Sequence, residues 1–294
     1  RLAGAVKGKA IFTCGATEAV NLAIKGIALH PSNQRRHIIS FTSEHRAVLD
    51  TLDYLAKAGF DVTLLNVNHD GLPHPGELEQ AIRPETCLVA MMFANNETGV
   101  IQPVREVSEI CRKHNVIFFC DATQALGKIP VNMNADGIDL LACSAHKLYG
   151  PKGIGALLMK AGELLHHLQP QTHGGGHELG MRSGTLNVPG IVGMGKACEI
   201  AFRESTAESS RLESLRNRFL DEVLGLPGAE LNGKLNLMLP HVANIRFKAD
   251  GGETLLRRLA PAVAASSGSA CSSAITRPSH VLKAMGLSDE DAYR

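Results

Sequence analysis

The chain has 294 residues, of which 44% are hydrophobic, and its formal net charge at pH 7 is +1. This length is enough to bury a sizeable core, and we expect one large and one smaller domain. The near-zero charge gives no electrostatic footprint for nucleic acid or an acidic membrane, and no apolar run approaches the length that spans a bilayer. Seven cysteines without a Cys-x-x-Cys pair argue against a disulfide framework, so we expect a cytoplasmic protein.

Short apolar runs alternate with helical stretches through the first two-thirds of the chain. We expect strands at residues 10–13, 37–41, 62–65, 87–93, 116–120, 140–143 and 154–159. We expect helices at residues 18–29, 46–58 and 104–114. Continuously apolar strands are typical of a sheet that is covered on both faces, and their alternation with helices indicates an α/β fold with a mostly parallel sheet.

The last third of the chain has a different organisation. A helical pattern at residues 191–224 has a charged middle, and Pro227-Gly228 ends it. We predict a large domain at residues 1–206 and a smaller α+β domain at residues 207–294. The elements expected in the smaller domain are strands near Glu230 and at residues 242–247, a helix from Glu253, a loop at residues 266–277 and a helix from Ser279.

Two charged residues stand where predicted strands end. Asp121 follows the strand at residues 116–120, and Lys147 lies in the segment Ser144-Ala145-His146-Lys147 at the end of the next strand. In parallel α/β sheets, ligands bind at the carboxyl ends of the strands. A lysine amine can form a Schiff base with an aldehyde, and a carboxylate can hold the ring nitrogen of pyridoxal phosphate. The two residues together therefore indicate a pyridoxal phosphate enzyme.

A phosphate site is expected at the turn that opens the first helix. The backbone N–H groups at Ala16 and Thr17 and the Thr17 hydroxyl follow a strand and begin a helix, which suits a phosphate. An ordinary helix cap is the alternative interpretation of this turn, and on the turn alone it is favoured. Ser144 and His146 would reach the same phosphate if Lys147 lies beside it.

Other polar residues at predicted strand ends suit the cofactor ring. The amides of Asn95 and Asn96 can bind its phenolic oxygen, although an Asn-rich segment is also typical of a plain turn. Gln124 lies three residues past Asp121 and could face the same ring. His45 opens a helix, where it could stack on the ring and move protons, although a lone histidine is more often structural.

A second reactive group is expected at Cys271, in a stretch of small residues at positions 266–274. The other six cysteines lie in or beside apolar stretches, where a thiol behaves as a small hydrophobe. Cys271 has no such surroundings, and a thiol in a loop could attack a bound substrate and carry the product away. A linker with an incidental cysteine is the alternative that composition leaves open.

The histidines of His173-Gly174-Gly175-Gly176-His177 have the spacing of a metal-ligand pair on a helix. Three intervening glycines disfavour a helix. We therefore expect a glycine-rich loop and no metal site.

Seven motifs occur together, in order and over nearly the whole chain. They are residues 15–18 (Gly-Ala-Thr-Glu), 42–45 (Thr-Ser-Glu-His), 95–99 (Asn-Asn-Glu-Thr-Gly), 121–124 (Asp-Ala-Thr-Gln), 144–147 (Ser-Ala-His-Lys), 181–185 (Met-Arg-Ser-Gly-Thr) and 266–274 around Cys271. This set resembles the group I cysteine desulfurases (NifS/IscS type) of the class V aminotransferase family. The resemblance implies a homodimeric pyridoxal phosphate-dependent transferase of fold type I, with a mostly parallel seven-stranded sheet sandwiched by helices and a smaller C-terminal α+β domain.

The resemblance also implies a reaction in which L-cysteine becomes L-alanine and the sulfur stays on Cys271 as a persulfide. Lys147 would hold the cofactor and transfer protons, Asp121 would pair with the ring nitrogen, and His45 would stack on the ring. The residues that the resemblance assigns to cofactor binding are Ala16, Thr17, His45, Asn96, Asp121, Gln124, Ser144, His146, Lys147 and, from the other subunit, Thr185.

The implied partners are an iron–sulfur scaffold or another sulfur acceptor, with a transient iron–sulfur cluster on Cys271 during transfer. The length of the loop at residues 266–277 suits group I. In the family, sequence precedes the equivalent of Leu2 and continues past Arg294 with an arginine that binds the substrate carboxylate, so we expect that arginine to lie outside this chain. Two alternatives remain open: a selenocysteine lyase or transaminase-like enzyme of the same fold, and a binding role without turnover.

Overall fold

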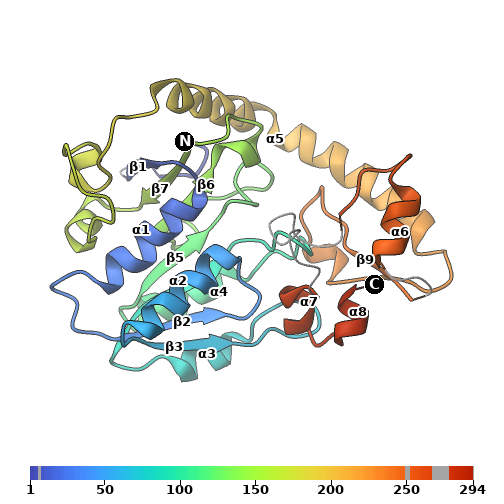
Figure 1. Ribbon diagram of the computed structural model, residues 1–294, viewed down its shortest axis with the longest axis horizontal. Coiled ribbons are helices and arrows are strands. Elements are labelled where there is room, and N and C mark those ends of the chain that lie inside the picture. Colours follow the sequence, from blue (N-terminus) through green and yellow to red (C-terminus); the bar gives the residue numbers. More distant parts are fainter. Residues whose placement is uncertain (6–7, 249–251, 267–277, 294) are drawn as a thin grey trace.

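A computed structural model describes residues 1–5, 8–248, 252–266 and 278–293 (Figure 1). Its first part is a seven-stranded sheet in the order β1-β7-β6-β5-β4-β2-β3. The strands are β1 (Lys9–Thr13), β2 (His37–Phe41), β3 (Asp61–Leu65), β4 (Thr86–Met92), β5 (Ile117–Asp121), β6 (Leu140–Ser144) and β7 (Gly155–Met159). The helices beside them are α1 (Ala16–Ala28), α2 (Arg46–Lys57), α3 (Pro75–Ala81) and α4 (Val104–Lys113).

The sheet is mostly parallel, because only β7 runs against its neighbours β1 and β6. The fold class expected from the sequence is therefore confirmed, and each boundary predicted for the seven strands of this sheet falls within one residue of the observed one. The seven-residue helix α3 was not predicted. Two turns of helix are too short for a clear apolar period.

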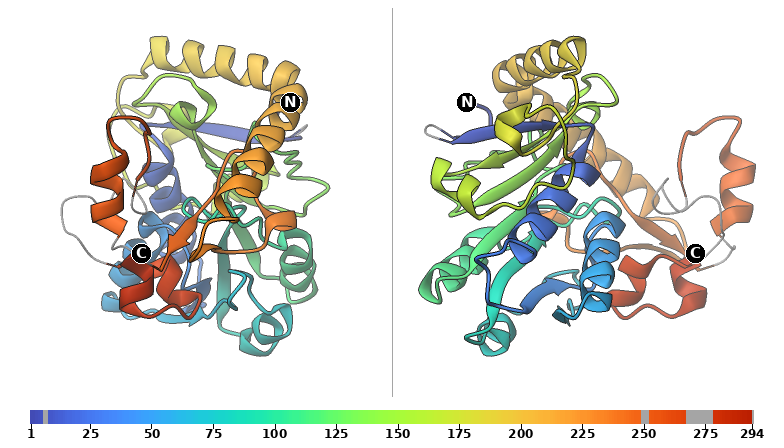
Figure 2. Two further views of the ribbon diagram at one scale, coloured as in Figure 1. Left: turned by 90° about the vertical axis from the view of Figure 1, so that its right-hand side faces the viewer. Right: turned by 60° about the vertical axis from the view of Figure 1, so that its left-hand side comes forward.

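Helices cover both faces of the sheet, as the two side views show (Figure 2). Phe118 and Phe119 are successive residues of β5, point to opposite faces and are both fully buried. Phe119 packs in one core with residues of α1 and α2, whereas Phe118 packs in another with residues of α3, α4 and the start of α5 (Val188–Val223). This burial on two sides explains why the strands are continuously apolar.

The smaller part of the structure follows α5, which begins beside the sheet and extends to the other side of the molecule (Figure 1). Its elements are β8 (Ala229–Leu231), β9 (Ile245–Phe247), α6 (Gly252–Leu259), α7 (His280–Ala284) and α8 (Asp289–Tyr293), and β8 pairs with β9 in an antiparallel hairpin. The boundary predicted at residue 206 lies inside the unbroken helix α5, and the division into domains stays a prediction. No helix within the described ranges is both long and apolar enough to cross a membrane.

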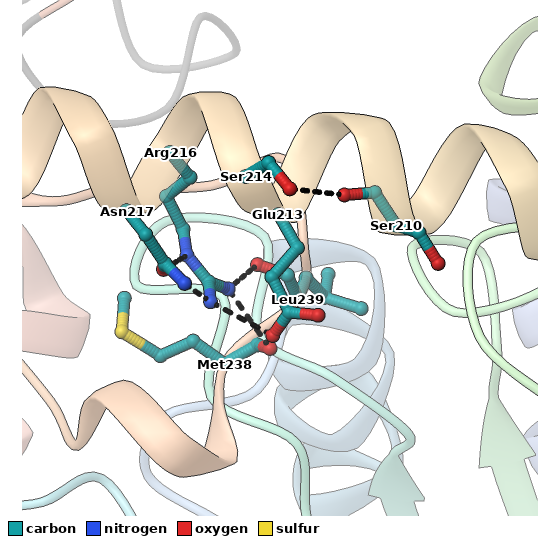
Figure 3. Close-up of polar contacts among 7 residues, drawn as sticks. All are labelled: Ser210, Glu213, Ser214, Arg216, Asn217, Met238 and Leu239. Carbon is teal, nitrogen blue, oxygen red and sulfur yellow. Dashed lines mark hydrogen bonds and ion pairs between the residues drawn. The ribbon is translucent and has the colours of Figure 1, made fainter.

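Arg216 connects α5 to the rest of the molecule (Figure 3). Its buried guanidinium donates to the Leu239 carbonyl oxygen at 2.7 Å and to Asn217 Oδ1 at 3.0 Å, and it pairs with Glu213 at 3.2 Å. Leu239 in turn donates its N–H to the Gly99 carbonyl oxygen at 2.8 Å. Because a buried charge is tolerated only when its donors are satisfied, these contacts fasten α5 to the segment that supports the loop at residues 95–99.

Gly155 allows the turn after β1 to approach the sheet closely. In the strand register, Gly155 lies opposite both Thr13 and Ser144. A Cβ atom on Gly155 would lie 2.6 Å from the Cys143 carbonyl oxygen and 2.7 Å from the Gly15 carbonyl carbon. A side chain at this position is therefore excluded by lack of space, and the turn at Gly15 lies against the first residue of β7.

We predict that Gly155→Ala destabilises the protein by about 1–3 kcal/mol, because the added methyl group must push the Gly15 turn or the Cys143 carbonyl aside. Gly195→Ala is the matched control, since nothing lies within 4 Å of its Cβ position in α5 and alanine should stabilise that helix by about 0.5–1 kcal/mol. Urea unfolding measures both free energies. Equal unfolding free energies for Gly155→Ala and the unsubstituted protein would contradict the close approach.

Candidate active site

The predicted site residues meet at one edge of the sheet. Strands β1, β2, β4, β5 and β6 run in the same direction, so their carboxyl ends share that edge. The residues placed at or just after these strand ends are Ala16, Thr17, His45, Asn96, Asp121, Gln124, Ser144, His146 and Lys147. Asp121 ends β5, and Lys147 lies in the 3-10 helix η1 (Ala145–Leu148) directly after the neighbouring strand β6.

The phosphate side of this edge is formed by the start of α1 and the end of β6. Gly15 precedes α1 without any side-chain cap, so the first N–H groups of the helix are open to an anion. Ser144 Oγ lies 3.9 Å from the position that a Cβ on Gly15 would take, and it is 2.8 Å from His146 Nδ1. Glu18 Oε2 accepts the Cys14 N–H at 2.5 Å just before the helix, so the turn keeps part of the capped arrangement that was the alternative interpretation, and the phosphate contacts stay a prediction.

The state of His146 also suits an anion site. Partial burial, and then the charges of Lys147 and Lys152, hold the pKa of His146 below its usual value. The imidazole is therefore neutral at neutral pH and keeps one N–H to donate.

The ring side of the edge has polar groups with unused bonding capacity. Asp121 is 7% exposed and its Oδ1 accepts the Thr123 N–H at 3.0 Å, which leaves Oδ2 for another donor. The Thr123 hydroxyl is buried without a partner among the described residues. Lys147 is exposed, and within the described ranges no hydrogen bond or ion pair holds its amine. Within the part of the chain that the structure describes, these are a hydroxyl without a partner, a carboxylate with one oxygen open and an unpaired lysine, and they fit a ring that carries both a basic nitrogen and an aldehyde.

His45 is held in place by the helix that it begins. It is the N-cap of α2, and its Nδ1 accepts the Ala47 N–H at 3.1 Å. A neutral imidazole that accepts at Nδ1 carries its proton on Nε2. The ring orientation is therefore set locally, and Nε2 is the atom that remains to donate.

Asn95 cannot contact a cofactor, contrary to the sequence expectation that both amides would suit the ring oxygen. Its Oδ1 accepts the N–H groups of Glu97 and Thr98, and its Nδ2 donates to the Ser43 carbonyl oxygen at 3.0 Å. The hydrogen-bonding groups of the side chain thus connect the 95–99 loop with the segment at Ser43. Asn96, which is only partly buried, is the amide left for a ligand.

Gln124 and Thr185 lie in different surroundings. Gln124 is partly buried in the turn after Asp121. Thr185 is exposed, and it lines a small hollow with Thr13 and Cys14 of the same chain. The cofactor contacts assigned to these two residues stay predictions.

His241 is a partly buried histidine whose proximity to Lys147 the sequence did not reveal. Its Nδ1 is buried without a partner in the described part of the chain. Burial, followed by the charges of Lys128, Lys147 and Arg216, lowers the pKa of His241 to about 4. A neutral imidazole therefore stands within electrostatic reach of Lys147. A single histidine more than ninety residues from Lys147 gives no sequence signal of this proximity.

The six described cysteines have weakly acidic thiols. Burial raises the pKa of Cys87 to about 11 and of Cys111 and Cys143 to about 12, and it also raises the pKa of Cys120 and Cys198. Cys14 is exposed, so the expectation that it packs as a small hydrophobe is wrong. Its pKa is nevertheless raised, first by a hydrogen bond with Glu18. Cys271 lies outside the described residues.

Comparison with known proteins identifies the family. The aminotransferase class-V pattern matches residues 2–288, and the chain therefore belongs to the aminotransferase class-V family. It is 47% identical to "Cysteine desulfurase IscS" of Pectobacterium carotovorum subsp. carotovorum (strain PC1) over 99% of this chain and 72% of that protein.

Solved structures agree with this assignment. The fold matches "NIFS-LIKE PROTEIN" with a TM-score of 0.86 and 37% identity, over 97% of this chain and 74% of that one. It matches "SspA in complex with cysteine" with a TM-score of 0.82 and 36% identity, over 97% and 79% of the two chains. The resemblance to cysteine desulfurases noted in the sequence is thereby confirmed, as is pyridoxal phosphate as the cofactor of the class.

We predict that iodoacetamide at pH 8 modifies Cys14 in the folded protein well before it modifies Cys87, Cys111, Cys120 or Cys143. Those four thiols are buried and protonated, whereas Cys14 is exposed and only its raised pKa slows it. Peptide mass mapping over time measures the order, and the urea-unfolded protein is the control in which all five should react. Early modification of a buried thiol in the folded protein would contradict the packing.

Proposed function

We propose that this chain is a cysteine desulfurase that acts on L-cysteine with bound pyridoxal phosphate. The observation that carries the proposal is the placement of Lys147 and Asp121 at the ends of neighbouring strands, where the Lys147 amine has no partner among the described residues and only one Asp121 oxygen accepts a hydrogen bond there. The relative solved with bound cysteine supports L-cysteine as the substrate.

The residues of the site divide the work between holding and proton transfer. The start of α1, Thr17, Ser144 and His146 hold the phosphate, and Asp121 faces the ring nitrogen. Pyridoxal phosphate, when bound, supplies an electron sink for negative charge on the substrate. The Lys147 amine holds the cofactor aldehyde and moves protons at the substrate.

Three further side chains complete the ring side. His45 stacks on the ring and presents its Nε2–H. Asn96 and Gln124 contact the ring oxygen.

Cys271 is the sulfur acceptor in this proposal. Its thiolate attacks the sulfur of bound cysteine, so that an S–S bond forms and the Cβ–S bond breaks. The electron pair of the broken bond and the protons end in alanine, and the balance is L-cysteine plus enzyme thiol giving L-alanine plus enzyme persulfide. The raised pKa values of the six described thiols support this choice, because none of them is easily ionised.

The wider setting of the reaction follows from the same proposal. The protein acts as a homodimer in which Thr185 of each subunit contacts the phosphate of the other. The persulfide goes to an iron–sulfur scaffold or another acceptor protein in the cytoplasm, with a transient cluster on Cys271 during transfer.

Lys147→Ala is expected to abolish the visible absorbance that the protein has with pyridoxal phosphate, because no amine remains to hold the aldehyde. Lys152→Ala is the matched control and should keep the absorbance, since Lys152 lies on the exposed loop after η1. Absorption spectra after removal of free cofactor decide the point. An unchanged spectrum in Lys147→Ala would refute the assignment.

Cys271→Ser is expected to keep the cofactor absorbance and to form no persulfide from L-cysteine. Cys14→Ser, the exposed thiol among the described ones, serves as the comparison and should form persulfide normally. Mass spectrometry of the alkylated protein measures the persulfide. Its normal formation on Cys271→Ser would remove Cys271 from the mechanism.

A further inference from the structure

Glu44 is a buried acid that the proposed reaction does not use. It lies in the turn between β2 and α2, directly before His45, and it is 1% exposed. Its Oε1 accepts the Met92 N–H at 2.7 Å, whereas its Oε2 is buried and has no partner among the described residues. Among the described residues, one carboxylate oxygen of Glu44 thus accepts a hydrogen bond and the other has no donor.

The position of Glu44 connects it with Asp121. Met92 ends β4 and lies opposite Asp121 in the β4–β5 register, so the Glu44 carboxyl holds the strand end next to the Asp121 carboxylate. On its other side, the Glu44 carbonyl oxygen accepts the His280 Nε2 of α7 at 2.8 Å. The carboxyl therefore stands behind the residue that faces the ring nitrogen.

The groups around Glu44 do not support a negative charge there. Asp121 of β5 is an acid, Met92 of β4 offers one N–H, His280 of α7 is bound to the backbone carbonyl, and His45 is bound to its own helix. No cation forms an ion pair with the carboxyl within the described ranges. Burial, partly offset by the Met92 hydrogen bond and reinforced by the Asp121 charge, raises the pKa of Glu44 well above its usual value.

We propose that Glu44 is a positioning residue whose carboxyl is protonated at neutral pH, so that Asp121 keeps the negative charge that is offered to the ring nitrogen. The effect on the ring nitrogen rests on the proposed function, whereas the protonation of Glu44 is tested first on protein without cofactor. Two adjacent acids disfavour each other's ionised form, so one of them tends to take up a proton, and a proton held by Glu44 leaves Asp121 ionised. A neutral Glu44 holds β4 in place without that competition.

The sign of the stability effect follows from the raised pKa. When an acid in the folded protein binds its proton more tightly than the same acid in the unfolded chain, the bound proton stabilises the folded state. This contribution is complete at pH values below the pKa of the acid in the unfolded chain. That contribution is lost as the pH rises through the folded pKa. Glu44→Gln removes the titrating proton, so the variant should gain stability relative to the unsubstituted protein as the pH rises from 5 to 8.

The first experiment uses infrared spectroscopy and urea unfolding on protein without cofactor. A protonated carboxyl C=O band at pH 7 should be present in the unsubstituted protein and absent from Glu44→Gln. Asp139→Asn is the matched control, because burial also raises the pKa of Asp139 and its band must be told apart. The proposal is overturned, independently of enzyme activity, if Glu44→Gln leaves the infrared band unchanged and its stability difference from the unsubstituted protein does not depend on pH.

The second experiment separates positioning from mere packing in the cofactor-loaded enzyme. Glu44→Ala leaves the Met92 N–H without its acceptor and should lower kcat/KM roughly tenfold, and Glu44→Gln should recover most of that loss. The pH midpoint of the visible cofactor band should shift in Glu44→Ala and return in Glu44→Gln. If Glu44→Gln does not restore the pH midpoint of the band, a charged Glu44 is needed and the proposal of a neutral carboxyl is wrong. Loss of the band in Lys147→Ala tests the proposed function separately.

Discussion

The site depends on the close contact between Gly15, which precedes α1, and Gly155, which begins β7. Gly15 and Gly155 approach so closely that a Cβ on Gly155 would overlap the Gly15 backbone. One strand, β7, separates β1 from β6, and this contact brings the start of α1 beside Ser144. Without it, the open N–H groups of the helix and the Ser144–His146 pair would belong to separate parts of the surface.

Electrostatic differences between like groups give the edge its chemistry. Glu44 and Asp121 are both buried acids that each accept one backbone N–H, but the second oxygen of Glu44 is buried without a partner among the described residues, whereas in our proposal Asp121 faces the basic ring nitrogen. Among the histidines, His146 and His241 are kept neutral by burial and by nearby lysines. The protein thus sets protonation states mainly through what each side chain faces, and less through which residue type it is.

The sequence predicted the strands well because a sheet buried on both faces requires uninterrupted apolar residues, and Phe118 and Phe119 are both examples. It also placed Asp121 and Lys147 correctly at strand ends, since the direction of parallel strands determines which ends meet. The loop residues alone could not distinguish Asn95 from Asn96, which only the family resemblance singled out, because which amide is already hydrogen-bonded depends on the Ser43 carbonyl of another loop. The neutral state of Glu44 and the proximity of His241 to Lys147 likewise depend on residues that only folding brings near.

Helix α5 links the two ends of the described structure. Its 36 residues are continuously helical, although the helix changes direction between its first and second halves (Figure 2). Through Arg216 and Leu239 its second half is bonded to Gly99, in the loop that carries Asn96. The backbone hydrogen bonds of one helix therefore hold the start of α5 beside the sheet and its Arg216 contact behind the 95–99 loop in a fixed relation.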